Sequence, residues 1–118
     1  MEKLVFLIDS DFSLRENVTE LLELEGYQVV HITSDDAKSF FQNYHKGLIL
    51  LNMLTFDESI DSFIRFLKGK TDGIVVLCSD DEDPRIHEAD IKIFMPFNNH
   101  EFLRQLSDFI DAKATSKA

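Results

Sequence analysis

Five short apolar segments along the chain have the composition of β-strands. They cover residues 4–8, 27–32, 48–51, 74–77 and 91–95. The first, third and fourth segments contain no polar residue. This pattern is typical of strands that are buried on both faces of a parallel sheet. We therefore expect these three strands at the centre of one sheet.

Apolar residues recur at helical spacing between these segments. Each of the four resulting stripes is wide enough to pack one helix face against a sheet. The stripes are Leu14, Val18, Leu21 and Leu22; Ala37, Phe40, Phe41 and Tyr44; Ile60, Phe63, Ile64 and Leu67; and Phe102, Leu106, Phe109 and Ile110. Strands and helices thus alternate, which predicts a doubly wound α/β fold with right-handed crossovers and helices on both faces of a parallel sheet.

Local signals mark where some of these elements begin and end. Gly26 is expected to end the first helix, and Asn98 with Glu101 three residues later resembles a capping pair at the start of the last one. The connection between Cys78 and Lys92, residues 79–91, leaves room only for a shortened fourth helix of about two turns, near residues 84–88. The domain is expected to span residues 1–112, followed by a polar tail or the start of a linker at 113–118.

The composition narrows the class of protein. The chain has 118 residues, of which 44% are hydrophobic, and a net charge of −10 from 12 Lys+Arg and 22 Asp+Glu. One domain with one core fits this length. The acidic excess argues against a surface for nucleic acids or anionic membranes, although it leaves room for a small basic patch.

The cysteine content and the apolar runs of the sequence also indicate where in the cell the protein is located. Its single cysteine, Cys78, cannot form an intramolecular disulfide, and the chain opens without a charged and then apolar leader. No apolar run approaches the roughly 20 residues that cross a bilayer. We therefore expect a cytoplasmic protein.

Function in an open α/β sheet concentrates at the carboxyl ends of the strands. The residues that follow the first, third, fourth and fifth strands are Asp9-Ser10-Asp11, Asn52-Met53, Cys78-Ser79 and Met95-Pro96-Phe97. The order of these parts resembles the receiver domain of two-component response regulators, from Lys3 to about Ala112. Residues 7–15 are similar to the family's first strand, acidic pair and first helix, residues 48–51 to the strand before its phosphoacceptor aspartate, and Met95-Pro96-Phe97 to its Lys-Pro-Phe turn.

This resemblance implies a flavodoxin-like (βα)5 fold with strand order 2-1-3-4-5, but the family's functional positions are altered. The acidic pair that holds Mg²⁺ reads Asp9-Ser10, the phosphoacceptor aspartate is replaced by Asn52, the serine or threonine after the fourth strand by Cys78, and the lysine after the fifth strand by Met95. An amide is a poor nucleophile, Mg²⁺ requires several hard oxygen ligands, and methionine cannot pair with a phosphoryl group. We expect a degenerate phosphorylation pocket with no catalytic residue and no cofactor, in which Mg²⁺ binding is weak or absent.

The resulting hypothesis is a phosphorylation-independent pseudo-receiver that acts as a protein interaction module in bacterial signalling, not as an enzyme. Its expected partners are other signalling proteins, or a second copy through the fourth helix, fifth strand and fifth helix. The candidate interaction face comprises Lys92, Phe94, Asn98 and Asn99.

Two alternatives stay open at this point. One is a receiver that is phosphorylated at an unorthodox acceptor, Asp9 or Asp11; the other is a sensor that binds a small ligand, or a cation at Asp9 and Asp11, in the altered pocket. A redox role for Cys78 is disfavoured because the acidic run at 80–83 opposes a thiolate.

Overall fold

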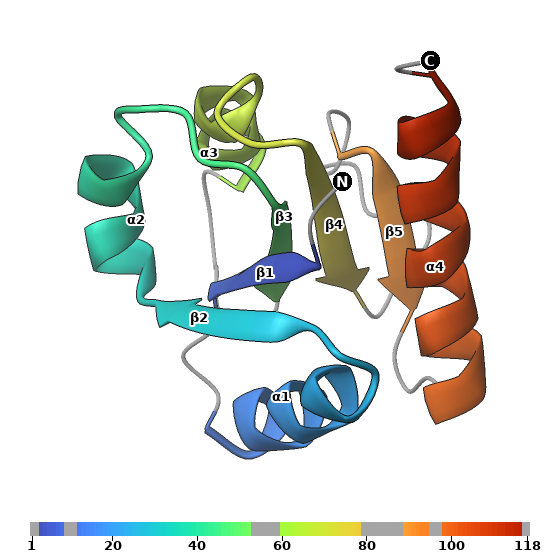
Figure 1. Cartoon of the computed structure of the whole chain (residues 1–118). Coiled ribbons are helices and arrows are strands. Elements are labelled where there is room, and N and C mark those ends of the chain that lie inside the picture. The colour runs from blue at the N-terminus through green and yellow to red at the C-terminus, as the bar shows by residue number, and fades with distance from the viewer. Residues whose placement is uncertain (1–2, 9–11, 53–59, 79–88, 95–97, 117–118) are drawn as a thin grey trace.

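A computed structural model of the chain describes residues 3–8, 12–52, 60–78, 89–94 and 98–116 (Figure 1). The elements in chain order are β1 (Leu4–Ile8), α1 (Phe12–Leu24), β2 (Gln28–Ile32), α2 (Ser34–Phe40), β3 (Leu48–Asn52), α3 (Ile60–Leu67), β4 (Gly73–Cys78), β5 (Ile91–Phe94) and α4 (Asn99–Ser116). The shortened fourth helix expected near residues 84–88 lies outside the described residues.

The five strands form one parallel sheet in the order β2-β1-β3-β4-β5. This confirms the predicted fold class and strand order, with the three uninterrupted apolar segments at the centre. All five residues of β3 are buried. A strand with neighbouring strands on both sides and helices on both faces has no surface in contact with solvent. Apolar residues fit such a strand without the hydrogen bonds that a buried polar side chain needs.

Two core clusters cover the two faces of the sheet. Alternate residues of β1 point to opposite faces, as the period of two in a strand requires. Phe6 and Ile8 pack with residues of α2 and α3, whereas Val5 and Leu7 pack with residues of α1 and α4. Figure 1 shows the same division, with α1 and α4 on one side of the sheet and α2 and α3 on the other.

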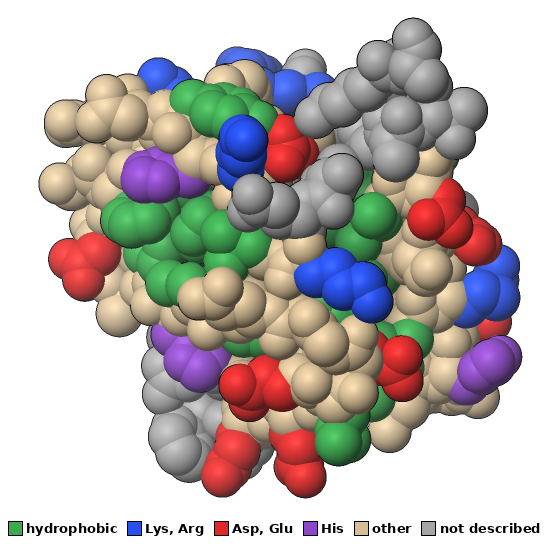
Figure 2. Space-filling view, viewed as in Figure 1, with side chains coloured by type: hydrophobic (Ala, Val, Ile, Leu, Met, Phe, Trp, Pro, Cys, Tyr) green, Lys and Arg blue, Asp and Glu red, His purple; other side chains and the backbone are tan. Residues whose placement is uncertain are grey.

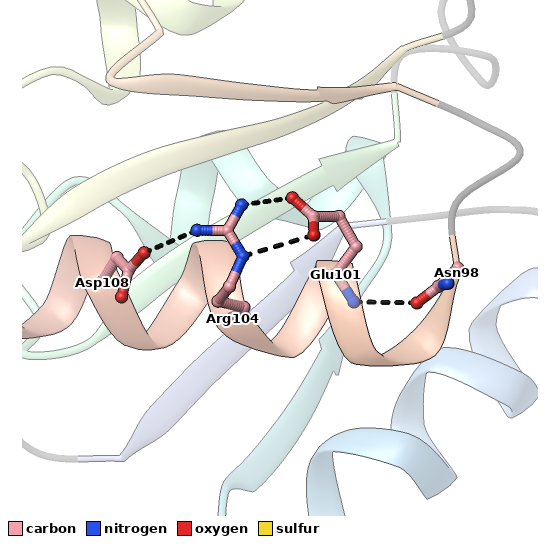
Figure 3. Close-up of polar contacts among 4 residues, drawn as sticks. All are labelled: Asn98, Glu101, Arg104 and Asp108. Atoms are coloured by element: carbon pink, nitrogen blue, oxygen red, sulfur yellow. Dashed lines mark hydrogen bonds and ion pairs between the residues drawn. The ribbon is translucent and has the colours of Figure 1, made fainter.

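The predicted helix signals at Gly26 and Asn98 are confirmed. The N–H of Gly26 donates to the carbonyl of Glu23 and the N–H of Tyr27 donates to that of Leu22, with Gly26 at φ 88°. This is the Schellman arrangement, which favours glycine because of its positive φ. At the start of α4, the Asn98 side-chain oxygen accepts a hydrogen bond of 2.9 Å from the N–H of Glu101 (Figure 3).

The prediction for the second helix was partly wrong. Thr33 caps α2, but the helix ends at Phe40, so the predicted stripe buries only Ala37 and Phe41. Phe40 remains 36% exposed and Tyr44, beyond the helix, 52% exposed. The helix is only seven residues long, and the chain then turns to enter β3, which carries the later part of the stripe away from the sheet.

The last helix runs further than the apolar stripe indicates. It reaches Ser116, so residues 113–116 of the expected polar tail have a helical backbone. Lys113 and Ala114 in this stretch are good helix formers, which favours continuation of the helix. No helix in the described ranges is both long and apolar enough to cross a membrane.

Asp72 ties together the two loops that precede β3 and β4. Its carboxylate accepts hydrogen bonds from the Tyr44 hydroxyl and, at 2.9 Å, from the N–H of Gly47, and its own N–H donates to the Gly47 carbonyl at 2.9 Å. The bond to Asp72 raises the pKa of Tyr44. Gly47 has φ 123°, and a Cβ there would lie 2.7 Å from the Leu4 carbonyl oxygen. Only glycine therefore fits this loop without a backbone shift.

We predict that Gly47→Ala lowers the free energy of unfolding by more than about 2 kcal/mol, since it adds a backbone clash to an unfavourable φ. The matched control is Gly69→Ala, which also has a positive φ (77°) but no atom within 4 Å of the added Cβ. It should lose about 1–2 kcal/mol from the left-handed backbone alone. Urea unfolding of both variants measures the difference, and equal losses would contradict the close approach at Gly47.

Candidate functional site

The carboxyl ends of the strands form one edge of the sheet. The register pairs Ile8 of β1 with Leu51 of β3, and Asn52 with Leu77 of β4. The last residue of β3, Asn52, therefore lies one register step from the last residue of β4, Cys78. The structure thus brings two of the five predicted pocket residues to the same edge. Asp9, Ser10 and Met95 lie outside the described residues, as does Asp11.

Asn52 is the only polar side chain that is buried in the part of the chain the structure describes, with 0% of its surface exposed. Burying a neutral amide costs far less than burying a carboxylate, which needs a nearby cation or several hydrogen-bond donors. The neutral amide of Asn52 therefore fits a fully buried position at the end of β3 at a lower cost than a carboxylate would.

Cys78 ends β4 and pairs with Phe94 of β5. Both are placed here by their backbone only. The expectation that the acidic run at 80–83 disfavours a thiolate at Cys78 stays a prediction, because that run lies outside the described residues.

Asp9 and Asp11 were the candidates for a cation site. They lie outside the described residues, so that hypothesis stays a prediction. Within the described ranges, no three His, Cys, Asp or Glu side chains gather as a metal site would require.

The predicted interaction face lies along β5 and the start of α4. Ile91 and Ile93 pack on the α1 and α4 side of the sheet, so Lys92, which is half-buried, lies on the opposite face of the strand. Asn99 is exposed at the first position of α4, whereas Asn98 caps that helix. Of the four predicted residues, Asn98 therefore has a structural role as a helix cap that explains its presence.

Charged side chains pair with one another along the outer face of α4 (Figure 3). The Arg104 guanidinium donates to the Glu101 carboxylate and, at 3.0 Å, to that of Asp108. The hydrogen bond to Arg104 lowers the pKa of Glu101, and Glu101 raises that of Arg104. Exposed pairs of this kind contribute little stability. The sequence reasoning missed this network, although the i, i+3 and i, i+4 spacing is visible in it.

The fold matches solved receiver domains. The chain is 17% identical to a CheY-like response regulator receiver domain protein from Methanospirillum hungatei, with a TM-score of 0.76 over 95% of this chain and 97% of that one. It is 18% identical to a receiver-modulated diguanylate cyclase from Pelobacter carbinolicus, with a TM-score of 0.76 over 99% and 98% of the two chains.

A third solved structure is the signal receiver domain of a histidine kinase from Syntrophus aciditrophicus. It is 18% identical, with a TM-score of 0.76 over 92% of this chain and 90% of that one. No protein-family model and no curated protein matches the sequence. The chain therefore has the receiver-domain fold of two-component signalling proteins.

We predict that Asn52→Asp makes stability depend on pH. Burial raises the folded-state pKa of a carboxyl group at this position, so the folded protein binds more protons than the unfolded one above about pH 4. The free energy of unfolding should therefore fall as the pH rises from about 4 to the folded-state pKa, by about 1.4 kcal/mol per unit of pKa rise.

The control for this prediction is Asn43→Asp, the same substitution at an exposed position. Thermal or urea unfolding from pH 4 to pH 8 compares the two variants with the wild type. If the free energy of unfolding of the two variants depends on pH in the same way, the end of β3 tolerates a charged side chain, which would contradict the prediction.

Proposed function

We propose that this chain is a phosphorylation-independent receiver-like module that acts through protein–protein contacts and has no enzymatic activity. The observation that carries the proposal is the fully buried Asn52 at the carboxyl end of the central strand β3, the position at which the receiver fold presents its phosphoacceptor. A neutral amide supplies neither the nucleophile for an acyl phosphate nor the charge for a metal ligand.

The other altered positions support the same conclusion by their chemistry. Ser10 reduces the acidic pair to one carboxylate, and Met95 has no cation for a transferred phosphoryl group. Cys78 offers a weaker hydrogen-bond donor than a hydroxyl group. Loss of the acceptor without loss of the lysine would leave a buried charge unpaired, so the changes at Asn52 and Met95 compensate each other.

A receiver fold without phosphoryl transfer responds to a partner, to its own abundance, or to a ligand that favours one conformer. Two of the matched solved structures are described as a receiver-modulated diguanylate cyclase and as the receiver domain of a histidine kinase. We propose, by analogy, that this module contacts another bacterial signalling protein in the cytoplasm. Lys92 and Asn99, at the edge strand β5 and the start of α4, are the proposed contact points; a second copy of the chain is the alternative occupant.

The test is the intact mass of the protein after incubation with acetyl phosphate and excess Mg²⁺. We predict that the wild type gains no phosphoryl group and that its amide NMR spectrum does not shift at Asn52 or Cys78. Asn43→Asp, which adds an exposed carboxylate elsewhere, is the control for non-specific labelling.

Each other result has a distinct meaning. A phosphoryl adduct on the wild type would overturn the proposal, and peptide mapping would then locate the acceptor, with Asp9 and Asp11 as the first candidates. Labelling of Asn52→Asp alone would show that the pocket lacks only its nucleophile. A concentration-dependent shift of the wild-type spectrum by Mg²⁺ without phosphodonor would instead favour a cation sensor.

A further inference from the structure

The positive charges of this acidic chain are concentrated in two segments. Residues 37–52 and 62–71 contain Lys38, Lys46, Arg65, Lys68 and Lys70, and no Asp or Glu. They therefore hold five of the 12 Lys+Arg of a chain whose net charge is −10. Asp35, Asp36, Asp61 and Asp72 flank these segments in the sequence, so the excess of positive charge is local to them.

The structure brings the two segments together at the amino-terminal edge of the sheet, opposite the edge that holds Asn52. The N–H of His45 donates to the Lys70 carbonyl at 2.9 Å, and the Lys70 ammonium donates to the Gln42 carbonyl at 3.3 Å. The contacts of Asp72 with Tyr44 and Gly47 add further links. The loops after α2 and α3 therefore form a single surface.

Aromatic side chains lie between these cations. Phe40 and Tyr44 are 36% and 52% exposed, and the Phe40 ring stacks on the His45 ring with centroids 4.2 Å apart. The Lys70 ammonium lies 6.0 Å from the centre of the half-buried Phe66 ring. Figure 2 shows Lys and Arg side chains, with an acidic group beside them, around hydrophobic groups and a histidine where α3 and the neighbouring loops lie in Figure 1. The basic aromatic face comprises Phe40, Tyr44, Lys46, Phe66, Lys68 and Lys70.

Helix stability explains only part of this face. Cations near the carboxyl end of a helix interact favourably with its dipole, which accounts for Lys38 in α2 and for Arg65 in the last turn of α3. Lys46 and Lys70 lie in loops outside both helices. The helix dipole does not require the exposed rings of Phe40 and Tyr44 either. Exposed aromatic rings beside cations are typical of surfaces that bind other proteins.

We propose that the basic aromatic face binds a short acidic segment of a partner protein that carries at least one aromatic or aliphatic side chain. The cations match acidic groups, and the exposed rings match an apolar side chain. A long polyanion or a membrane surface would extend beyond this face and meet the negative remainder of the chain, including Glu16, Glu20 and Glu23 along α1. A short segment avoids that repulsion.

A second copy of the chain is a less suitable occupant. Its exposed acidic stripe lies on α1, which covers the other face of the sheet from α2 and α3 (Figure 1). Pairing that stripe with the basic aromatic face would join copies head to tail, which does not close into a symmetric dimer.

The inference rests on the proposed role as an interaction module, but it concerns a different edge of the sheet. The test is therefore independent of phosphodonor labelling. A labelled wild type would overturn the proposed function and leave the binding result unchanged, whereas failure to bind at this face would leave the absence of phosphoryl transfer unchanged.

The experiment is an NMR titration of the full chain with a blocked peptide of Asp and Glu residues around a single Phe. We expect amide shifts at residues 40–47 and 66–72 that saturate and weaken with added salt. Lys46→Gln should weaken binding about twofold to fivefold, the range of an exposed ion pair, while Arg104→Gln, an equal charge change on α4, should leave it unaltered. Circular dichroism checks that both variants are folded.

Four results would overturn the proposal. They are the absence of shifts at these amides, an equal loss in Lys46→Gln and Arg104→Gln, shifts caused by single-stranded oligonucleotide or phosphatidylserine vesicles but not by the peptide, and concentration-dependent broadening of the same amides without any peptide. The third result would assign the face to a polyanion or membrane, and the fourth to a second copy.

Discussion

Burial of the central strands on both faces is the constraint on which the rest of this structure depends. Every residue of β3 is buried, and successive side chains of β1 pack into different clusters on opposite faces. Solvent reaches a sheet covered in this way only at the amino ends of its strands, at their carboxyl ends and along the two outer strands. Charged side chains of the sheet itself are therefore confined to those edges and to the outer strands, and the one buried polar side chain of the described residues, Asn52, lies where β3 reaches one of the edges.

Different residues adjoin the two ends of the strands. In the sequence, Asp9, Asp11 and the acidic run at 80–83 follow the carboxyl ends, whereas the amino-terminal edge carries Lys46 and Lys70 together with Asp72 and Asp90. In receivers that transfer phosphate, acidic groups at the carboxyl edge are offset by a metal ion and a lysine. The residue that the structure describes at the end of β3, Asn52, is neutral and adds no charge to this edge.

Local signals made most of the fold predictable from the sequence. Uninterrupted apolar runs located the central strands, Gly26 located a helix end and Asn98 a helix start, and the order of strand-end residues placed Asn52 and Cys78 on one edge. The end of α2 was missed because Tyr44 continues the helical spacing, whereas its position depends on Asp72, 28 residues away. The basic aromatic face was not predicted for the same reason. Segments far apart in the sequence form it, and the net charge of the whole chain does not reveal a local excess of cations.

The shortness of β3 has a consequence for how many molecules this domain can hold at once. The first and last Cα atoms of its five residues lie only about 13 Å apart, four steps of about 3.3 Å, yet the strand separates two edges of the sheet that share no side chain. A molecule at one end of the strand therefore leaves the other end accessible. Two ligands tethered to each other would raise each other's effective concentration on a domain that binds one of them at each end of this strand.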